Sequence, residues 1–112
     1  MHKIKELIIS DKYKVITNEH TLENTFNVVY CCDLLSAVIK HGSKNPILIT
    51  QINSITTIGV ATMLDLPAVI LTEGKIFGME MIEKANVEGL AIIYTELTSA
   101  ETILDLKARG IL

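Results

Sequence analysis

The sequence lacks tryptophan and has few other aromatic residues, since phenylalanine and tyrosine together make up only 4% of the chain. This scarcity argues against an aromatic recognition surface and favours a core of Ile, Leu, Val and Ala packed between helices and a sheet. Cysteine is also scarce, and Cys31 and Cys32 are adjacent, a spacing that suits neither an ordinary disulfide nor a structural zinc site. We interpret them as two buried or half-buried thiols without a redox role.

A long basic run and a long apolar run are also missing. The net charge is -3, so the chain has little of the positive charge that dominates binding to nucleic acid. No apolar stretch approaches the roughly 20 residues that span a bilayer, and the first residues contain no signal-peptide core. We therefore expect a cytoplasmic protein that contacts neither nucleic acid nor membrane. Its 112 residues, 49% of them hydrophobic, predict a single domain over residues 1–112.

Short aliphatic runs are what the sequence has in abundance. Residues 46–50 and 67–71 each begin at a proline and lack polar alternation, so both are predicted to be strands covered on both faces. The intervening residues 51–66 are long enough for a right-handed crossover helix, which makes the two strands parallel neighbours. Further strands are predicted at 25–31 and 90–94, and further helices at 34–41, at 78–87 and after Thr98. This alternation predicts an α/β fold of three layers, in which a mostly parallel sheet built from repeated strand-helix units has helices on both faces.

Capping signals mark the ends of two predicted helices. Asp33 is predicted to cap the helix over 34–41, which Gly42 ends, and Thr98 with Glu101 forms a capping-box pattern. The inward residues of the first of these helices are predicted to be Leu34, Leu35, Val38 and Ile39.

The first 24 residues are harder to interpret. Residues 2–9 place Ile4, Leu7 and Ile8 on one face of a predicted short helix. Residues 13–17 form a brief β-prone stretch, and a polar segment follows. The order of strands at this edge of the sheet stays open.

Polar residues follow each predicted strand. Ligands bind beyond the carboxyl ends of the strands in open parallel sheets, because helix N-termini gather there, so these residues form a candidate site for a small phosphorylated ligand. The candidate ligand-binding residues are Asp33, Thr50, Gln51, Asn53, Thr72, Gly74, Lys75 and Thr95. A second interpretation remains open, since Thr is common at strand ends and Asp and Asn are favoured helix caps.

No catalytic or metal-binding constellation is recognisable. His2, His20 and His41 are far apart in the sequence, and neither glycine-rich nucleotide motif is present. We therefore predict no catalytic residues, no metal and no cofactor. A small enzyme that uses Asp33 or Cys32 is the hypothesis we favour least.

Several stretches together carry a resemblance to a known family. They are Cys32 to Val38, Ile47 to Thr50 with Asn53, Ala61 to Asp65, Ala68 to Lys75, Glu83 to Ala85, the strand end at Thr95 and Ala108 to Gly110. From about residue 3 onward, the chain resembles stand-alone DRTGG domains and is similar to the N-terminal domain of HPr kinase/phosphorylase. DRTGG domains are α/β modules that also occur as the regulatory insert between cystathionine-beta-synthase (CBS) domains of some family II pyrophosphatases and attached to phosphotransacetylases.

The resemblance implies a non-catalytic regulatory module that forms a homodimer and binds a small phosphorylated ligand, such as an adenine nucleotide, at the strand ends. The chain departs from the family pattern at Glu73, because Thr72-Glu73-Gly74 stands where Thr-Gly-Gly would be expected. A glutamate there would repel a phosphate unless its side chain points away. The alternative function is an interaction or scaffold subunit that docks on a partner enzyme without a ligand.

Overall fold

The computed structural model describes residues 1–41 and 46–112. The predicted helix end at Gly42 and the side chain of His41 therefore lie outside the described part of the chain. The elements in chain order are β1 (His2–Lys3), η1 (Ile4–Ile9), β2 (Lys14–Val15), η2 (Glu19–Glu23), β3 (Thr25–Phe26), β4 (Val29–Cys31), α1 (Leu35–His41), β5 (Ile47–Thr50), α2 (Ile55–Met63), β6 (Ala68–Leu71), α3 (Met79–Glu88), β7 (Ala91–Tyr94) and α4 (Ser99–Ala108), where η marks a 3-10 helix.

Within the described residues, the main sheet has five strands in the order β2-β7-β6-β5-β4. Strands β4 to β7 are parallel to one another, as predicted, whereas β2 pairs antiparallel with β7 and places Lys14 opposite Tyr94. β1 and β3 form a separate two-stranded antiparallel ribbon. The sheet is therefore mixed but mostly parallel, and the predicted α/β class is confirmed.

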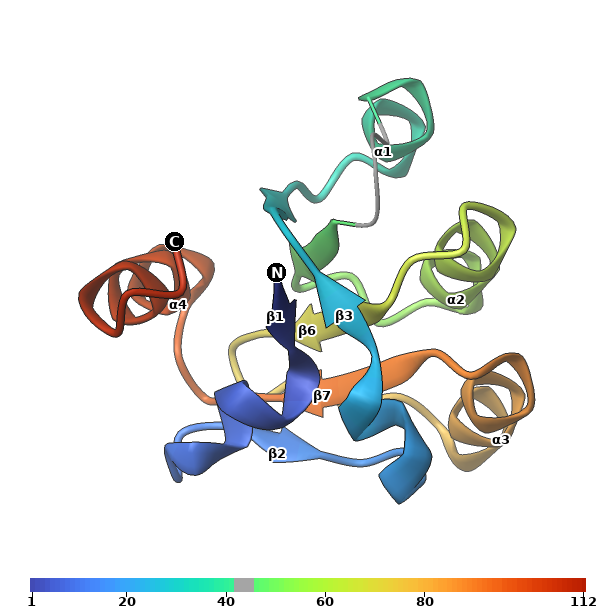
Figure 1. Ribbon diagram of the computed structural model, residues 1–112. Helices are drawn as coiled ribbons and strands as arrows, with labels where there is room; N and C mark the ends of the chain where they lie inside the picture. Colours follow the sequence, from blue (N-terminus) through green and yellow to red (C-terminus); the bar gives the residue numbers. More distant parts are fainter. Residues whose placement is uncertain (42–45) are drawn as a thin grey trace.

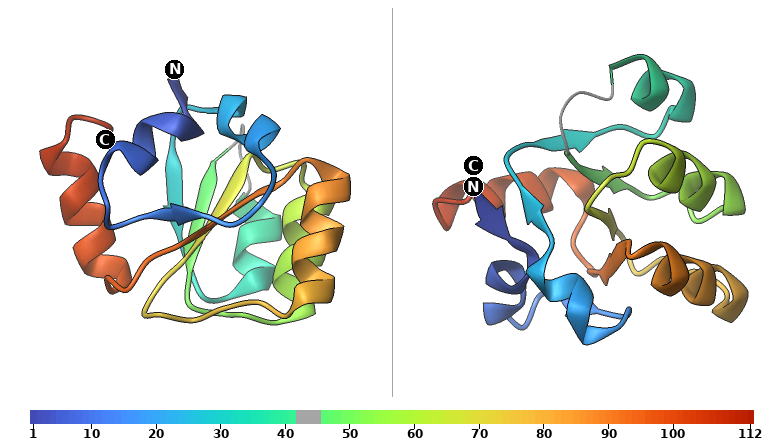
Figure 2. Two further views of the ribbon diagram at one scale, coloured as in Figure 1. Left: turned by 90° about the horizontal axis from the view of Figure 1, so that it is seen from below. Right: turned by 45° about the vertical axis from the view of Figure 1, so that its right-hand side comes forward.

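Helices lie on both faces of this sheet (Figures 1 and 2). β4, β5, β6 and β7 are neighbours in chain order, so right-handed crossovers place α1, α2 and α3 on one face. α4 follows β7 onto the opposite face, where η1 and η2 also lie. Alternate residues of each central strand supply two cores: Ile47 and Ile49 pack toward α4, and Leu48 packs toward α1 to α3.

The first predicted helix is a 3-10 helix, and one of its predicted inward residues is wrong. Ile4 and Leu7 are buried, but Ile8 is 37% exposed. A 3-10 helix has three residues per turn, so Ile4 and Leu7 share a face and Ile8 is rotated away from it.

The predicted strand over 25–31 is two strands. Thr25–Phe26 pairs with the N-terminal strand β1, whereas Val29–Cys31 joins the main sheet beside β5. The chain bends at Asn27 because the two halves pair with different partners.

α1 buries fewer residues than predicted. Val38 is buried, but Leu34 is 64% and Ile39 is 48% exposed. Among the described elements, α1 lies at the end of its layer and has a helical neighbour, α2, on one side (Figure 1), so the prediction that Leu34 and Ile39 point inward is wrong. In the described residues, no helix has both the length and the apolar character that crossing a membrane requires.

Candidate functional site

β4, β5, β6 and β7 all end on the same side of the sheet, which we call its carboxyl end. The eight candidate ligand-binding residues lie at the last residue of these strands or in the loops just beyond them. Hydrogen bonds join Asp33, Thr50 and Gln51 beyond β4 and β5, and further bonds from Asn53 and Thr72 link this group to the loops beyond β6 and β7.

Asp33 joins the ends of β4 and β5. Its Oδ1 accepts hydrogen bonds from Thr50 Oγ1 at 2.7 Å and from the Gln51 N–H at 3.0 Å, and its Oδ2 accepts from Gln51 Nε2 at 3.2 Å. The predicted helix-capping role of Asp33 is therefore wrong. The sulfur of Cys32 accepts the Leu34 N–H instead, at 3.3 Å.

These contacts also determine the charge of Asp33. Partial burial raises the pKa of the carboxyl group, but the hydrogen bonds from Gln51 and Thr50 outweigh that effect and hold the pKa below its ordinary value. Asp33 is therefore a carboxylate whose two oxygens are both hydrogen-bonded. Such a group is a poor proton donor at neutral pH.

The three threonines at the strand ends are buried, and their hydroxyl groups stabilise the turns. Thr50 Oγ1 also accepts the Ile52 N–H at 3.2 Å. Thr72 Oγ1 lies 3.2 Å from Ser99 Oγ, and Thr95 Oγ1 accepts the Leu97 N–H at 3.2 Å. Asn53 also supports a loop, since its Nδ2 donates to the Ile76 carbonyl at 3.0 Å.

The loops that follow β6 and β7 are bonded to each other. The Glu73 N–H donates to the Leu97 carbonyl at 2.8 Å, and the Gly74 N–H donates to the Thr95 carbonyl at 3.0 Å. Both Glu73 and Gly74 have positive φ, of 60° and 69°. The Glu96 side chain lies so close to Gly74 that a Cβ added there would be 2.5 Å from Glu96 Oε2.

A hollow of about 240 Å³ opens beside these loops. β6 leads to α3 on one face of the sheet and β7 leads to α4 on the other (Figure 2), and in open parallel sheets a crevice forms where connections leave for opposite faces. Because β2 runs antiparallel to β7, its first residues lie at the same place. We call this feature the lysine hollow, and it is lined by Asp11, Lys12, Tyr13, Lys14, Gly74, Lys75, Ile76, Tyr94, Thr95 and Glu96.

Three lysines and two carboxylates give the lysine hollow its charge. Lys14 and Lys75 are exposed, and Lys12 lies beside them. Asp11 and Glu96 oppose them, so the lining carries one net positive charge although the chain is acidic. The sequence prediction found Gly74, Lys75 and Thr95 but missed Lys12 and Lys14. Four lysines among the first 14 residues were the available signal, and only the pairing of β2 with β7 shows where two of them lie.

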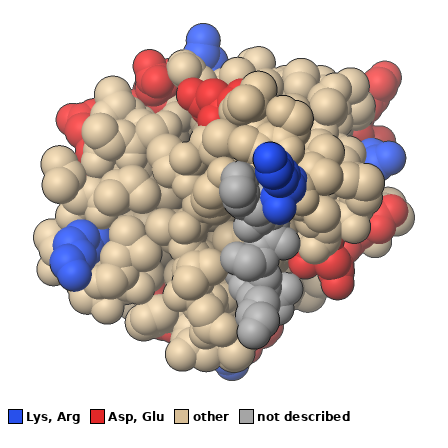
Figure 3. Space-filling view, turned by 90° about the horizontal axis from the view of Figure 1, so that it is seen from above, with Lys and Arg blue, Asp and Glu red and all other residues tan. Residues whose placement is uncertain are grey.

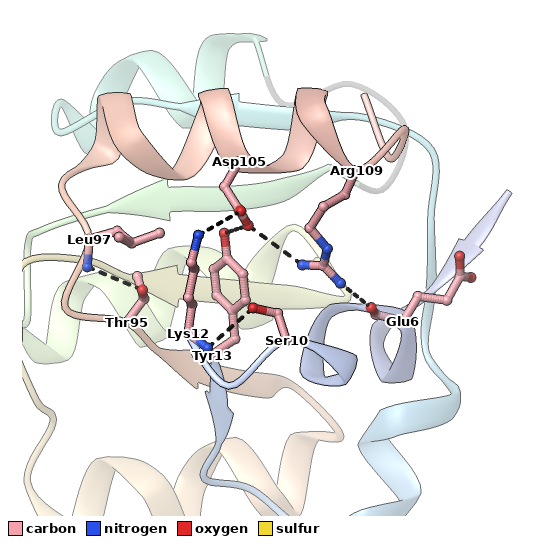
Figure 4. A network of polar contacts seen from close by, with 8 residues as sticks. All are labelled: Glu6, Ser10, Lys12, Tyr13, Thr95, Leu97, Asp105 and Arg109. Carbon is pink, nitrogen blue, oxygen red and sulfur yellow. Dashed lines mark hydrogen bonds and ion pairs between the residues drawn. The ribbon is translucent and has the colours of Figure 1, made fainter.

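Behind the lysine hollow, a polar network joins the N-terminal segment to α4 (Figure 4). The Tyr13 hydroxyl donates to Asp105 Oδ2 at 2.6 Å, and Lys12 Nζ donates to Asp105 Oδ1 at 3.3 Å. Arg109 is the third partner of Asp105 and the second positive one, with Nη1 3.6 Å from Asp105 Oδ2, and its Nη2 donates to the Glu6 carbonyl at 2.6 Å.

The network shifts two pKa values in opposite directions. Burial raises the pKa of Asp105, but Tyr13, Lys12 and Arg109 outweigh it, so the net pKa lies below its ordinary value. Burial, and then the bond to Asp105, raises the pKa of Tyr13, whose phenol therefore stays neutral. Asp105 is thus an ionised group with three partners, namely Tyr13, Lys12 and Arg109, and of these Lys12 is the lysine.

The two histidines whose side chains are described, His2 and His20, lie in separate segments. His2 contacts Glu6 at 2.9 Å, and His20 lies in η2. Within residues 1–41 and 46–112, no three His, Cys, Asp or Glu side chains gather closely enough to hold a metal ion.

No protein-family model and no curated protein matches the chain. Among solved structures, it is similar to the CBS and DRTGG domains of the regulatory region of Clostridium perfringens pyrophosphatase, complexed with the activator diadenosine tetraphosphate. The TM-score is 0.74 at 17% sequence identity, over 91% of this chain and 44% of that chain. The present chain thus spans less than half the length of that regulatory region. At this identity the likeness shows the fold, and it confirms the predicted DRTGG resemblance at that level.

Proposed function

We propose that this chain, a DRTGG-like domain by its fold, is a non-catalytic regulatory module that binds a small phosphorylated ligand, such as an adenine nucleotide, and forms a homodimer. The observation that carries the proposal is the lysine hollow at the carboxyl end of the sheet. A hollow between connections that leave for opposite faces is where ligands bind in open α/β sheets. Its lysines supply the donors that a phosphate needs.

The eight candidate residues take two roles in this proposal. Gly74, Lys75 and Thr95 line the lysine hollow and face the ligand. Asp33, Thr50, Gln51, Asn53 and Thr72 support the neighbouring loops through their hydrogen bonds. A volume of about 240 Å³ is slightly below the usual range of roughly 300–1,000 Å³ for ligand pockets, so the hollow holds the phosphate end of a nucleotide and leaves part of the molecule exposed.

Two further observations support a regulatory role. The similar Clostridium perfringens structure is a regulatory region complexed with an activating dinucleotide, which makes an adenine nucleotide a reasonable ligand class here. Asp33, the strongest candidate for acid or base chemistry, has both carboxylate oxygens hydrogen-bonded. The proposal therefore assigns binding to this chain and leaves catalysis to a partner enzyme.

Isothermal titration calorimetry with ATP, diadenosine tetraphosphate and pyrophosphate tests the binding proposal. Lys75→Met should weaken binding by about tenfold, because a charge-assisted contact to phosphate is worth roughly 1.5 kcal/mol. Lys84→Met is the matched control, since Lys84 is an exposed lysine of α3 outside the hollow, and it should bind like the unmodified chain. No heat and no thermal shift with any of the three compounds would overturn the proposal.

A second candidate function, an interaction subunit that docks on a partner enzyme without a ligand, is favoured by the β4 edge of the sheet. Residues 25–32 contain no charged side chain, and Val28, Leu34 and Ile39 are 45%, 64% and 48% exposed. In the view of this side of the molecule, most of the middle is uncharged and the charged side chains lie mainly toward the rim (Figure 3). An exposed apolar edge of this kind is a common protein-binding surface.

Light scattering decides between self-association and docking at this edge. The homodimer proposal expects a mass of about twice the 12.4 kDa of the chain and a monomer for the double variant Leu34→Lys, Ile39→Lys. A dimer that survives both changes would leave the β4 edge to a partner enzyme, whereas a monomeric unmodified chain would refute the homodimer.

A further inference from the structure

Two residues that line the lysine hollow also contact α4. Lys12 and Tyr13 belong to the lining, and both donate a hydrogen bond to Asp105, the acidic residue in the middle of α4 (Figure 4). Asp105 itself does not line the hollow. Lys12 and Tyr13 thus lie directly between the hollow and Asp105 of α4.

The two contacts differ in how easily they exchange. The Tyr13 bond is short, at 2.6 Å, and Tyr13 is 4% exposed. The Lys12 bond is longer, at 3.3 Å, and the Lys12 side chain is 52% exposed to water. Half-exposed ion pairs of this length contribute little, so Lys12 is free to change partners. Asp105 is 13% exposed and would keep Tyr13 and Arg109 if Lys12 left, so no buried charge would be stranded.

We infer that a phosphate bound in the lysine hollow competes with Asp105 for Lys12, so that occupancy of the hollow is transmitted to α4. This inference rests on the proposed function, because it concerns the same ligand. A phosphate group carries more charge than a carboxylate and meets Lys14 and Lys75 in the same hollow. Lys12 therefore turns toward the ligand, and the N-terminal segment loses its Lys12 contact with Asp105 of α4.

The competition is reciprocal, and affinity therefore measures it. If bound phosphate weakens the contact between Lys12 and Asp105, that contact must weaken phosphate binding by the same factor. Removing the charge of Asp105 should therefore tighten phosphate binding. Asp105→Asn suits this purpose because an amide oxygen still accepts the Tyr13 hydroxyl. We expect pyrophosphate to bind about twofold to fivefold more tightly, the range that one exposed ion pair represents.

A double-mutant cycle separates this mechanism from a general effect of charge. Pyrophosphate is titrated into the full chain, Lys12→Met, Asp105→Asn and the double variant. The inference expects Asp105→Asn to tighten binding in the unmodified background and to change nothing in the Lys12→Met background. Hydrogen exchange of α4 provides a second readout, with faster exchange around Asp105 when pyrophosphate is bound to the unmodified chain.

The outcomes distinguish the inference from the proposed function. An equal gain in affinity from Asp105→Asn in both backgrounds, or no gain in either, overturns the role of Lys12 while the ligand site stands. Failure of the unmodified chain to bind pyrophosphate or nucleotide overturns both. Unchanged exchange in α4 on binding would likewise refute transmission to the helix.

Discussion

Glu73 and Asp65 share a backbone conformation that most residues avoid. Their φ angles are 60° and 56°, in the left-handed region, where a side chain with a Cβ atom costs about 1 to 2 kcal/mol relative to the right-handed region. Glycine adopts this conformation without that cost but loses more freedom on folding, by roughly 0.5 to 1 kcal/mol. The two effects together predict that Glu73→Gly raises the free energy of unfolding by about 0.5 to 1 kcal/mol.

Urea denaturation checks this value, and Asp65→Gly is the matched control. Asp65 lies just beyond α2, which ends at Met63, and it has a positive φ like Glu73, so both changes should stabilise the fold. Glu73 is exposed and does not line the lysine hollow, so Glu73→Gly should alter pyrophosphate affinity less than Lys75→Met does. A destabilised Glu73→Gly variant would mean that the glutamate side chain itself supports the turn.

α4 begins with a complete capping box. The Thr98 hydroxyl accepts the Glu101 N–H at 3.1 Å, and a Glu101 carboxylate oxygen accepts the Thr98 N–H at 2.9 Å. Thr98→Ala removes the first contact and should lower the free energy of unfolding by about 1 kcal/mol. Thr56→Ala is the control, because Thr56 is an exposed residue in the first turn of α2 and should change stability by less than about 0.5 kcal/mol. Equal effects of the two changes on thermal unfolding would show that the box contributes nothing to α4.

Sequence patterns predicted the elements that are determined by residues close together in the sequence. The capping box is complete within four residues, and the aliphatic runs of β5 and β6 identify buried strands by themselves. β2 is different, because Lys14 and Val15 become a strand only through their antiparallel pairing with β7. Asp33 was assigned a local role as a helix cap, yet its partners Thr50 and Gln51 lie 17 and 18 residues away. Such partners become visible only once the strand order is known.

At the scale of the whole molecule, the two edges of the sheet have opposite character. The β2 edge carries Lys12 and Lys14 beside the lysine hollow, whereas residues 25–32 bring no charge to the β4 edge. Lysines on an edge strand discourage strand-to-strand association, and an uncharged edge permits it. The proposed ligand site and the proposed contact surface therefore lie at opposite ends of one sheet, and a ligand in the hollow leaves the β4 edge free.

Acid should destabilise the whole fold, and two carboxylates, Asp33 and Asp105, should contribute to this loss. The pKa values of Asp33 and Asp105 both lie below their ordinary value of 3.8 in the folded chain, so the unfolded chain binds more protons as the pH falls. Their contribution to stability is therefore fully present above about pH 5 and is lost as the pH falls through about 4 and below. Urea titrations of the unmodified chain between pH 7 and pH 3 should show a free energy of unfolding that is level at first and then declines.

The double variant Asp33→Asn, Asp105→Asn identifies the source of that decline. Both asparagines keep an acceptor oxygen but cannot ionise, so this variant should be less stable at pH 7 and lose less stability on going to pH 3. Glu80→Gln, at an exposed position of α3, removes one carboxylate as a control and should follow the unmodified chain. If the double variant declines as steeply as the unmodified chain, other carboxylates carry the acid response, and the hydrogen bonds of Asp33 and Asp105 do not favour their ionised forms.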